Sequence, residues 1–183
     1  MIYILLADGF EEIEALCPLD ILRRAGLSVL TVGIDKQEIE GAHGITVKAD
    51  ISSKDLPIDS IDKIDALILP GGMPGTKNLD NSQFVHAMID SAIANDSYIA
   101  AICAAPMILG KRGMLKGRFA VCYPGFEEYL IDANIPNGKK VVIDRKIITA
   151  KGMGVADEFG FTLVELLCSE EKALSIRKAT ISD

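Results

Sequence analysis

Cys103 is the residue whose place in the sequence most clearly suggests chemistry. In the pentapeptide AICAA it has a small residue two positions before it and another two positions after it. The G-x-S-x-G pattern around a serine nucleophile has the same spacing, because small side chains let a sharp strand-to-helix turn pack closely. Pro106 suits the first turn of a helix that starts soon after the cysteine. Two interpretations stay open: a nucleophile at such a turn, or a small apolar residue in a core.

A helix that begins just after Cys103 would also affect its thiol. The unpaired backbone N–H groups of a first helical turn carry partial positive charge, which favours thiolate over thiol. We therefore expect the pKa of Cys103 to be unusually low.

Two other loops carry groups that could work together with a thiolate. ADGFEE follows an apolar run and leads into a helical pattern in which Glu14 lies at the edge of the apolar face. Glu11 and Glu12 are expected at the surface, because acidic residues are common in a first helical turn. LPGGMPG contains consecutive glycines, whose N–H groups could face an oxyanion. Taken alone, LPGGMPG is better explained as an ordinary tight turn.

Short apolar runs alternate with helical patterns along the chain, which predicts an α/β sandwich around a mainly parallel sheet. Strands are predicted at residues 2–7, 27–33, 45–49, 65–69, 98–102 and 118–122, a hairpin at 141–150, and helices at 11–26, 82–94, 104–113 and, as one or two helices, 152–178. Ligands of such sheets bind outside the carboxyl ends of the strands. Cys103 and both loops are predicted at such ends.

Composition narrows the class of protein. The chain has 183 residues, 49% of them hydrophobic, which suits a single domain over residues 1–183. A net charge of −7 disfavours binding to nucleic acid or to an anionic membrane. No run is long enough to span a bilayer and no basic leader precedes the first strand, so a cytoplasmic protein is expected. The four cysteines are too widely spaced for a CxxC motif, and no disulfide framework is expected.

Cofactor motifs are not found in the sequence. KGMGVADEFG lacks the G-x-G-x-x-G spacing of a dinucleotide site, and PGGMPGTKN lacks the Gly-Lys-Ser/Thr end of a P-loop. His43 and His86 have no cysteine or carboxylate at metal-ligand spacing, and His86 is expected on a solvated helix face. We therefore expect no metal and no cofactor.

Four segments together resemble one known family. They are DGFEEIEALCPLDILRRAG, ILPGGMPGTKNL, AAICAAP and AKGMGVADEFG. Over nearly the whole chain they are similar to the ThiJ/PfpI superfamily, in the ThiJ-like branch that contains a Parkinson's-associated redox protein. The resemblance implies a flavodoxin-like domain of the class I glutamine amidotransferase-like type, with helices on both faces of the sheet and a nucleophile elbow.

The same resemblance implies roles for five residues. Cys103 would be the reactive nucleophile at the elbow, and Glu14 a partly protonated carboxyl group hydrogen-bonded to its sulfur. Gly72 and Ala104 would supply oxyanion N–H groups, with Gly71 beside them in the site.

The resemblance also implies a homodimer and exposes two differences. His43 falls where a loop residue near the partner's site is expected, and Arg24 where the branch has a structural arginine near the interface. Protease-like members have a histidine directly after the cysteine, where this chain has Ala104, so we do not expect peptidase activity. Other members have a histidine where this chain has Tyr123, a poor proton shuttle with a reference pKa of about 10.

Two functions remain open for a reactive thiol of this kind. The first is a cysteine-dependent glyoxalase or deglycase that acts without glutathione on 2-oxoaldehydes such as methylglyoxal and glyoxal, or on their protein adducts. The second is an oxidative-stress sensor whose cysteine oxidation regulates a chaperone, with no enzymatic turnover. A small aldehyde or a glycated protein is therefore the expected partner.

Overall fold

The centre of the fold is a sheet with the strand order β5-β2-β1-β6-β7-β9-β8. The structure is a computed structural model that describes residues 1–61 and 63–182. All neighbouring strands are parallel except β8 and β9, which form the predicted hairpin. The order β2-β1-β6-β7-β9 is that of flavodoxin-like proteins, and it confirms the predicted fold. The strands are β1 (Ile2–Leu6), β2 (Val29–Gly33), β5 (Ile51–Ser52), β6 (Ala66–Leu69), β7 (Tyr98–Ile102), β8 (Val141–Asp144) and β9 (Ile147–Ala150).

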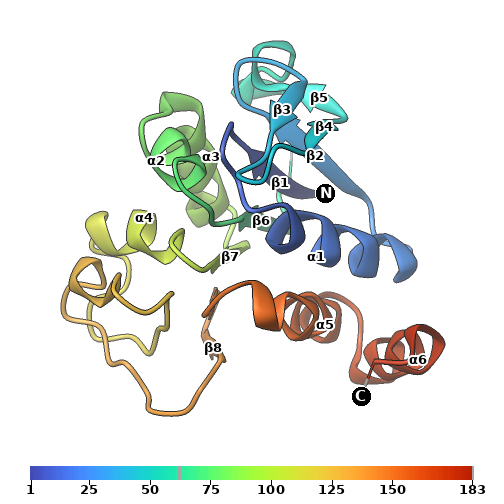
Figure 1. The fold of residues 1–183 in the computed structure, drawn as a ribbon, viewed down its shortest axis with the longest axis vertical. Coiled ribbons are helices and arrows are strands. Elements are labelled where there is room, and N and C mark those ends of the chain that lie inside the picture. The colour runs from blue at the N-terminus through green and yellow to red at the C-terminus, as the bar shows by residue number, and fades with distance from the viewer. Residues whose placement is uncertain (62, 183) are drawn as a thin grey trace.

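Helices cover both faces of this sheet, as Figure 1 shows. Strand β1 is buried on both sides: Ile4 belongs to one core, with α1, α5 and α6, and Leu5 to the other, with α2, α3 and α4. Continuous apolar strands are typical of a parallel sheet that is covered twice. The helices are α1 (Glu12–Arg24), α2 (Gly75–Asp80), α3 (Gln83–Ala94), α4 (Pro106–Lys111), α5 (Ala156–Leu167) and α6 (Glu170–Thr180). The closing segment is thus two helices, and none of the helices in the described ranges is both long and apolar enough to span a membrane.

A small second sheet holds the turn that contains His43. Strand β4 (Thr46–Lys48) was predicted and pairs antiparallel with β3 (Glu38–Glu40), which was not predicted. Short 3-10 helices complete the chain at Ser53–Asp55, Ile58–Ser60, Glu127–Tyr129 and Met153–Val155.

The strand predicted at residues 118–122 is wrong. The segment forms only an isolated bridge, between Phe119 and Asn134. Strand β8 already occupies the place beside β9, so side chains take over part of the pairing: Asp144 accepts from the N–H of Phe119 at 2.8 Å, and Thr149 from the N–H of Val121 at 2.9 Å. The apolar residues of this segment are typical of a buried strand. Both sides of β9 are already paired, however, with β7 and with β8.

Candidate active site

Cys103 lies at a sharp turn between β7 and α4, and its backbone has a φ of +64°. This left-handed conformation is uncommon for a residue with a side chain, and it is found where the surrounding structure enforces it. Here the Cys103 N–H donates to the carbonyl of Ala150 at 2.9 Å, and its carbonyl accepts from the N–H of Tyr123 at 2.8 Å. The predicted nucleophile elbow is present, and Pro106 begins α4 as expected.

Glu14 reaches the sulfur from the first turn of α1. Glu11 caps this helix by accepting from the N–H of Glu14 at 2.9 Å. The Glu14 side chain is buried, with 1% of the residue exposed, and its carboxyl accepts from the N–H of Gly71 at 2.9 Å. A second backbone bond comes from Met153, and the carboxyl is hydrogen-bonded to the thiol of Cys103. The structure thus brings Cys103 and Glu14 together from elements far apart in the sequence.

Burial sets the acidity of this pair. It raises the pKa of Glu14 to about 7, with a smaller contribution from the charge of Glu11, although hydrogen bonds from Cys103 and the backbone oppose the change. Burial, followed by the charge of Glu14 and their hydrogen bond, raises the pKa of Cys103 to about 12. The expectation of an unusually acidic thiol was therefore wrong, because the backbone N–H groups lower the pKa less than burial and the carboxylate raise it.

Two backbone N–H groups face the sulfur, those of Gly72 and Ala104. Gly72 has a φ of +88°, and a Cβ there would lie 2.4 Å from the backbone N of Glu11. A Cβ at Gly71 would lie 2.5 Å from both the Cys103 Cβ and the Glu14 Oε2. Glycine is required at Gly71 because the β6–α2 loop lies against the pair, and at Gly72 because its φ is positive and the loop lies against the backbone before α1.

An open cavity of 590 Å³ gives access to the pair, at the carboxyl ends of the strands. His43 and Tyr123 both line it, although the resemblance implied a place for His43 near the partner's site. The full lining is Glu11, Glu14, His43, Cys103, Tyr123, Pro124, Lys140, Lys151, Gly152, Met153, Gly154 and Val155. The two lysines were not predicted, although Lys151 directly follows a strand whose carboxyl end could have indicated it.

Arg24 lies away from this cavity. It is ten residues beyond Glu14 along α1, a distance of about 15 Å at the rise of an α-helix. Its guanidinium pairs with Asp20 at 2.6 Å on the helix surface. Arg24 therefore does not line the site in this structure.

Glu12 and His43 form an unexpected contact beside the site, in which the carboxylate is buried and the imidazole is exposed. Glu12 is 2% exposed, so its predicted surface position is wrong. Its carboxylate accepts from the backbone N–H of His43 at 2.8 Å and lies 2.8 Å from the ring Nδ1. Burial alone would raise the pKa of Glu12, but these bonds hold it below its usual value. Gly41 leaves the necessary room, since a Cβ there would lie 2.3 Å from the Glu12 Oε1.

In the fold, His43 lies beside the carboxylates of Glu11 and Glu12, which are too far away in the sequence to be recognised as its neighbours. Ligand atoms of Glu11, Glu12 and His43 lie within 4.8 Å of one another, a spacing that a metal ion could bridge. Each group already has a partner within the protein: Glu11 caps α1, and Glu12 bonds to His43. The other histidine, His86, is half-buried rather than solvated.

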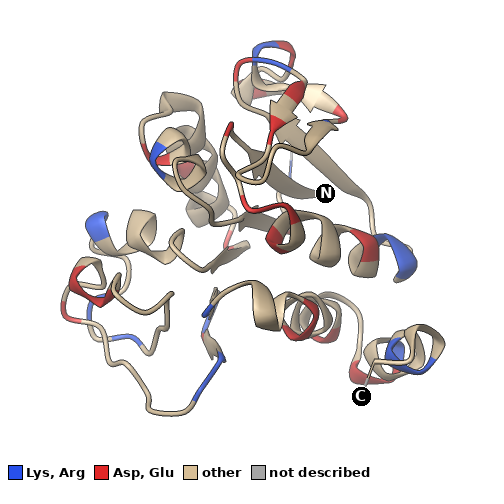
Figure 2. Ribbon diagram, viewed as in Figure 1, with Lys and Arg blue, Asp and Glu red and all other residues tan. Residues whose placement is uncertain are grey.

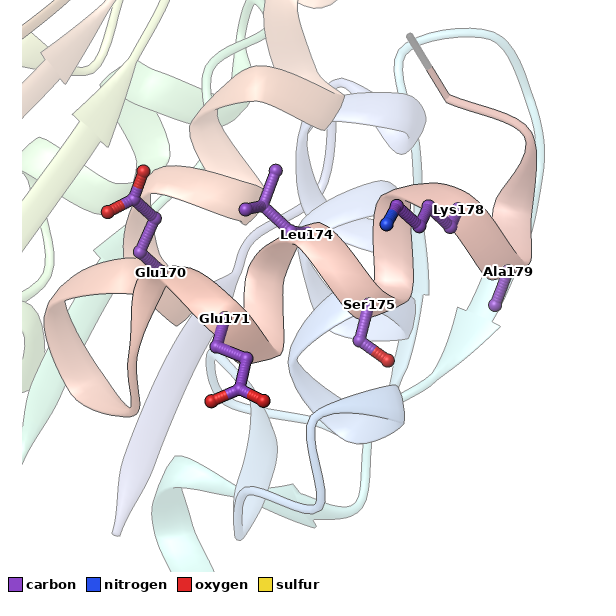
Figure 3. Close-up of a pocket in the computed structure, with 6 residues that line it drawn as sticks. All are labelled: Glu170, Glu171, Leu174, Ser175, Lys178 and Ala179. Carbon is purple, nitrogen blue, oxygen red and sulfur yellow. The ribbon is translucent and has the colours of Figure 1, made fainter.

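A larger hollow of 850 Å³ lies on the outer face of α6 (Figure 3). Its lining residues, Glu170, Glu171, Leu174, Ser175, Lys178 and Ala179, all come from this one helix. It contains no cysteine and no buried titratable group, so the chemistry is assigned to the smaller cavity at Cys103.

Comparison with known proteins agrees with this geometry. The model of the DJ-1/PfpI family matches residues 1–166. The chain belongs to the DJ-1/PfpI family. The crystal structure of Drosophila melanogaster DJ-1beta has a TM-score of 0.91 and 32% identity, with 100% of this chain and 97% of that chain covered.

Relatives in this family differ in length and in the activities that their names state. Protein DJ-1 homolog B of Arabidopsis thaliana is 38% identical over 93% of this chain, which spans only 39% of that protein. The glutathione-independent glyoxalase DJR-1.2 of Caenorhabditis elegans is 33% identical over 93% of this chain and 90% of its own length. A protein of Pyrococcus abyssi named a deglycase is 31% identical over 84% of this chain and 90% of its own length.

Proposed function

We propose that the protein is a cysteine-dependent glyoxalase or deglycase that converts 2-oxoaldehydes, free or as protein adducts, without glutathione. The single observation that carries the proposal is the hydrogen bond between the buried Glu14 carboxyl and the thiol of Cys103, at the base of an open cavity. Relatives named as a glyoxalase and a deglycase support the same chemistry.

The first step uses the proton that Glu14 and Cys103 share. With a pKa of about 7 at Glu14, the pair loses its first proton near neutral pH. When the remaining proton lies on Glu14, the charge lies on sulfur, where the Glu14 O–H and two backbone N–H groups stabilise it. This thiolate attacks the aldehyde carbon, and a carbon–sulfur bond forms as the carbonyl oxygen becomes an alkoxide.

The second step moves a proton between the two carbons of the substrate. The N–H groups of Gly72 and Ala104 face the sulfur and are in reach of an oxygen on the attacked carbon. Glu14 gives its proton to this alkoxide, and its carboxylate then removes the proton of the first carbon and returns it to the second. The hydroxyl proton of the first carbon passes to the oxygen of the second, so the first carbon becomes the carbonyl of a thioester and the second carries the hydroxyl group. The resulting thioester is hydrolysed by water. The sum is one 2-oxoaldehyde plus one water to one 2-hydroxy acid, with no external oxidant or reductant.

A direct test measures methylglyoxal consumption in the absence of glutathione, with lactate identified as the product by NMR. We expect turnover by the native protein and none by Cys103→Ser, while Cys168→Ser, on an exposed cysteine outside the cavity, keeps native activity. Equal activity of Cys103→Ser and the native protein would refute the proposal.

A second function, peroxide sensing, is favoured by the same donors. Sulfinate oxygens on Cys103 would be anionic and could accept from the Glu14 O–H and from the N–H groups of Gly72 and Ala104. Two molecules of peroxide would supply the two oxygen atoms. If the native protein shows no aldehyde turnover but forms this sulfinate selectively, sensing coupled to a chaperone role becomes the better proposal.

The proposal includes a homodimer. Ile13 on α1 and Ile45 beside the His43 turn are 47% and 55% exposed, and a second copy of the chain could bury both side chains. A second copy that covers them would bring its surface near His43. Light scattering of the native protein and of Ile45→Glu tests this, and a native monomer would contradict it.

A further inference from the structure

Two lysines at the cavity mouth have no role in the chemistry proposed above. Lys140 precedes β8 and Lys151 follows β9, and the Lys151 N–H donates to the Lys140 carbonyl at 2.9 Å. The register that pairs Val141 with Ala150 places the two lysines directly opposite each other. Figure 2 shows blue basic segments along this hairpin, beside the ribbon that leads to α5.

This pair of like charges has no counter-ion among the residues that the structure describes. None of the ion pairs there includes either lysine, whereas Lys146 in the turn of the same hairpin pairs with Asp96. Like charges directly opposite across an antiparallel pair are unfavourable. The arrangement is stabilised when an anion lies between the two ammonium groups.

The two acidic side chains that line the same cavity, Glu11 and Glu14, interact with groups other than the lysines. Glu11 caps α1 and lies 3.9 Å from the ring of His43, and Glu14 bonds to Gly71 and to the sulfur. The lysines are therefore the charged groups of the cavity that are left for a ligand. The whole chain has a net charge of −7, so the positive charge of these two lysines is confined to the opening of the cavity.

We propose that Lys140 and Lys151 form an anion-binding subsite, so that the preferred substrates are 2-oxoaldehydes with a carboxylate or phosphate on the tail. The inference rests on the proposed function and names its substrate class. The tail lies between the two ammonium groups while the aldehyde carbon reaches Cys103. The reaction is the one given above, with the anionic tail unchanged between substrate and product.

The test compares 4,5-dioxopentanoate, which carries a carboxylate, with its methyl ester, which has the same chain and no charge. We expect the native protein to prefer the acid, and Lys140→Met with Lys151→Met to lower kcat/KM for the acid by about tenfold or more, as loss of charged hydrogen bonds does. Turnover of the ester should fall less than turnover of the acid, so that the preference for the acid decreases in the double variant. Lys139→Met is the matched control, because Lys139 is exposed and does not line the cavity. The phosphate analogue 2-oxo-3-phosphooxypropanal shows which anion is preferred.

A second measurement does not depend on turnover. Cys103 is alkylated with anionic iodoacetate and with neutral iodoacetamide at one pH, and the ratio of the two rates is compared between variants. The double variant should lower this ratio by about tenfold, and Lys139→Met should leave it unchanged. An unchanged ratio in the double variant overturns the subsite. A lowered ratio without any aldehyde turnover would retain the subsite and refute only the glyoxalase proposal.

Discussion

The burial of the Glu14 carboxyl should make the free energy of unfolding depend on pH. Replacement of Glu14 by glutamine should remove this dependence. The pKa of this carboxyl is raised from 4.5 to about 7 in the folded protein. A group with a higher pKa in the folded state binds more protons there than in the unfolded state, so the stability that it contributes is lost as the pH rises. This contribution is complete below about pH 4.5 and is lost as the pH rises through about 7.

The size of the effect follows from the two pKa values. At about 1.4 kcal/mol for each pKa unit, the change corresponds to about 3 kcal/mol between low and high pH. Between about pH 5 and pH 8.5 the native free energy of unfolding should fall by about 2 to 3 kcal/mol relative to that of Glu14→Gln. The uncharged amide has no such dependence, and its oxygen can still accept from the N–H of Gly71.

Urea unfolding of both proteins at each pH provides the measurement. Glu165→Gln is a suitable control, because it removes an exposed carboxylate from α5, outside the cavity. Its stability should follow that of the native protein across the range. If the difference between native protein and Glu14→Gln stays constant, or grows in favour of the native protein as the pH rises, Glu14 does not carry a raised pKa and the shared proton of the mechanism is refuted.

Three further predictions concern the reactive pair. Alkylation of Cys103 by iodoacetamide should accelerate as the pH rises through about 7, where the pair loses its first proton, and a rate that rises only above pH 9 would contradict this. Gly71→Ala should abolish most activity while the protein stays folded, as seen by circular dichroism, because its Cβ would lie 2.5 Å from both partners; near-native turnover would be the contrary result. Tyr123→Phe should keep kcat within about twofold, since Glu14 carries the proton transfers of the proposed mechanism, and a hundredfold loss would assign Tyr123 a direct role.

The strands β1, β6 and β7 and the meeting of the loops that follow them could be predicted, because they depend on short-range signals and on one rule for parallel sheets. Apolar runs that end in glycine or aspartate locate β1, β6 and β7, and the rule for parallel sheets brings their carboxyl ends together. The stretch at residues 118–122 shows the limit of these signals. Its apolar residues are buried as in a strand, but whether a strand finds a partner depends on which neighbour takes the place beside β9.

Contacts between side chains from distant segments could not be predicted in the same way. The burial of Glu12 depends on the turn at His43, which lies 31 residues later and bonds it twice. The opposition of Lys140 and Lys151 depends on the register of a hairpin whose length was predicted but whose open end was not linked to the cavity. In each case the sequence shows the residue type, but only the fold shows which residue it contacts.

The acidity of Cys103 shows why local arguments fail at this site. A helix N-terminus alone favours the thiolate, and that was the basis of the prediction of a low pKa. The described structure places the sulfur beside a buried carboxyl, so the two groups compete for one negative charge. The elbow holds the sulfur where Glu14 and two backbone N–H groups converge, and reactivity then depends on which partner carries the shared proton. In the proposed mechanism the thiolate near neutral pH is the minor form of the pair in which Glu14 keeps the shared proton, because the charge that Glu14 loses by protonation is the charge that sulfur gains.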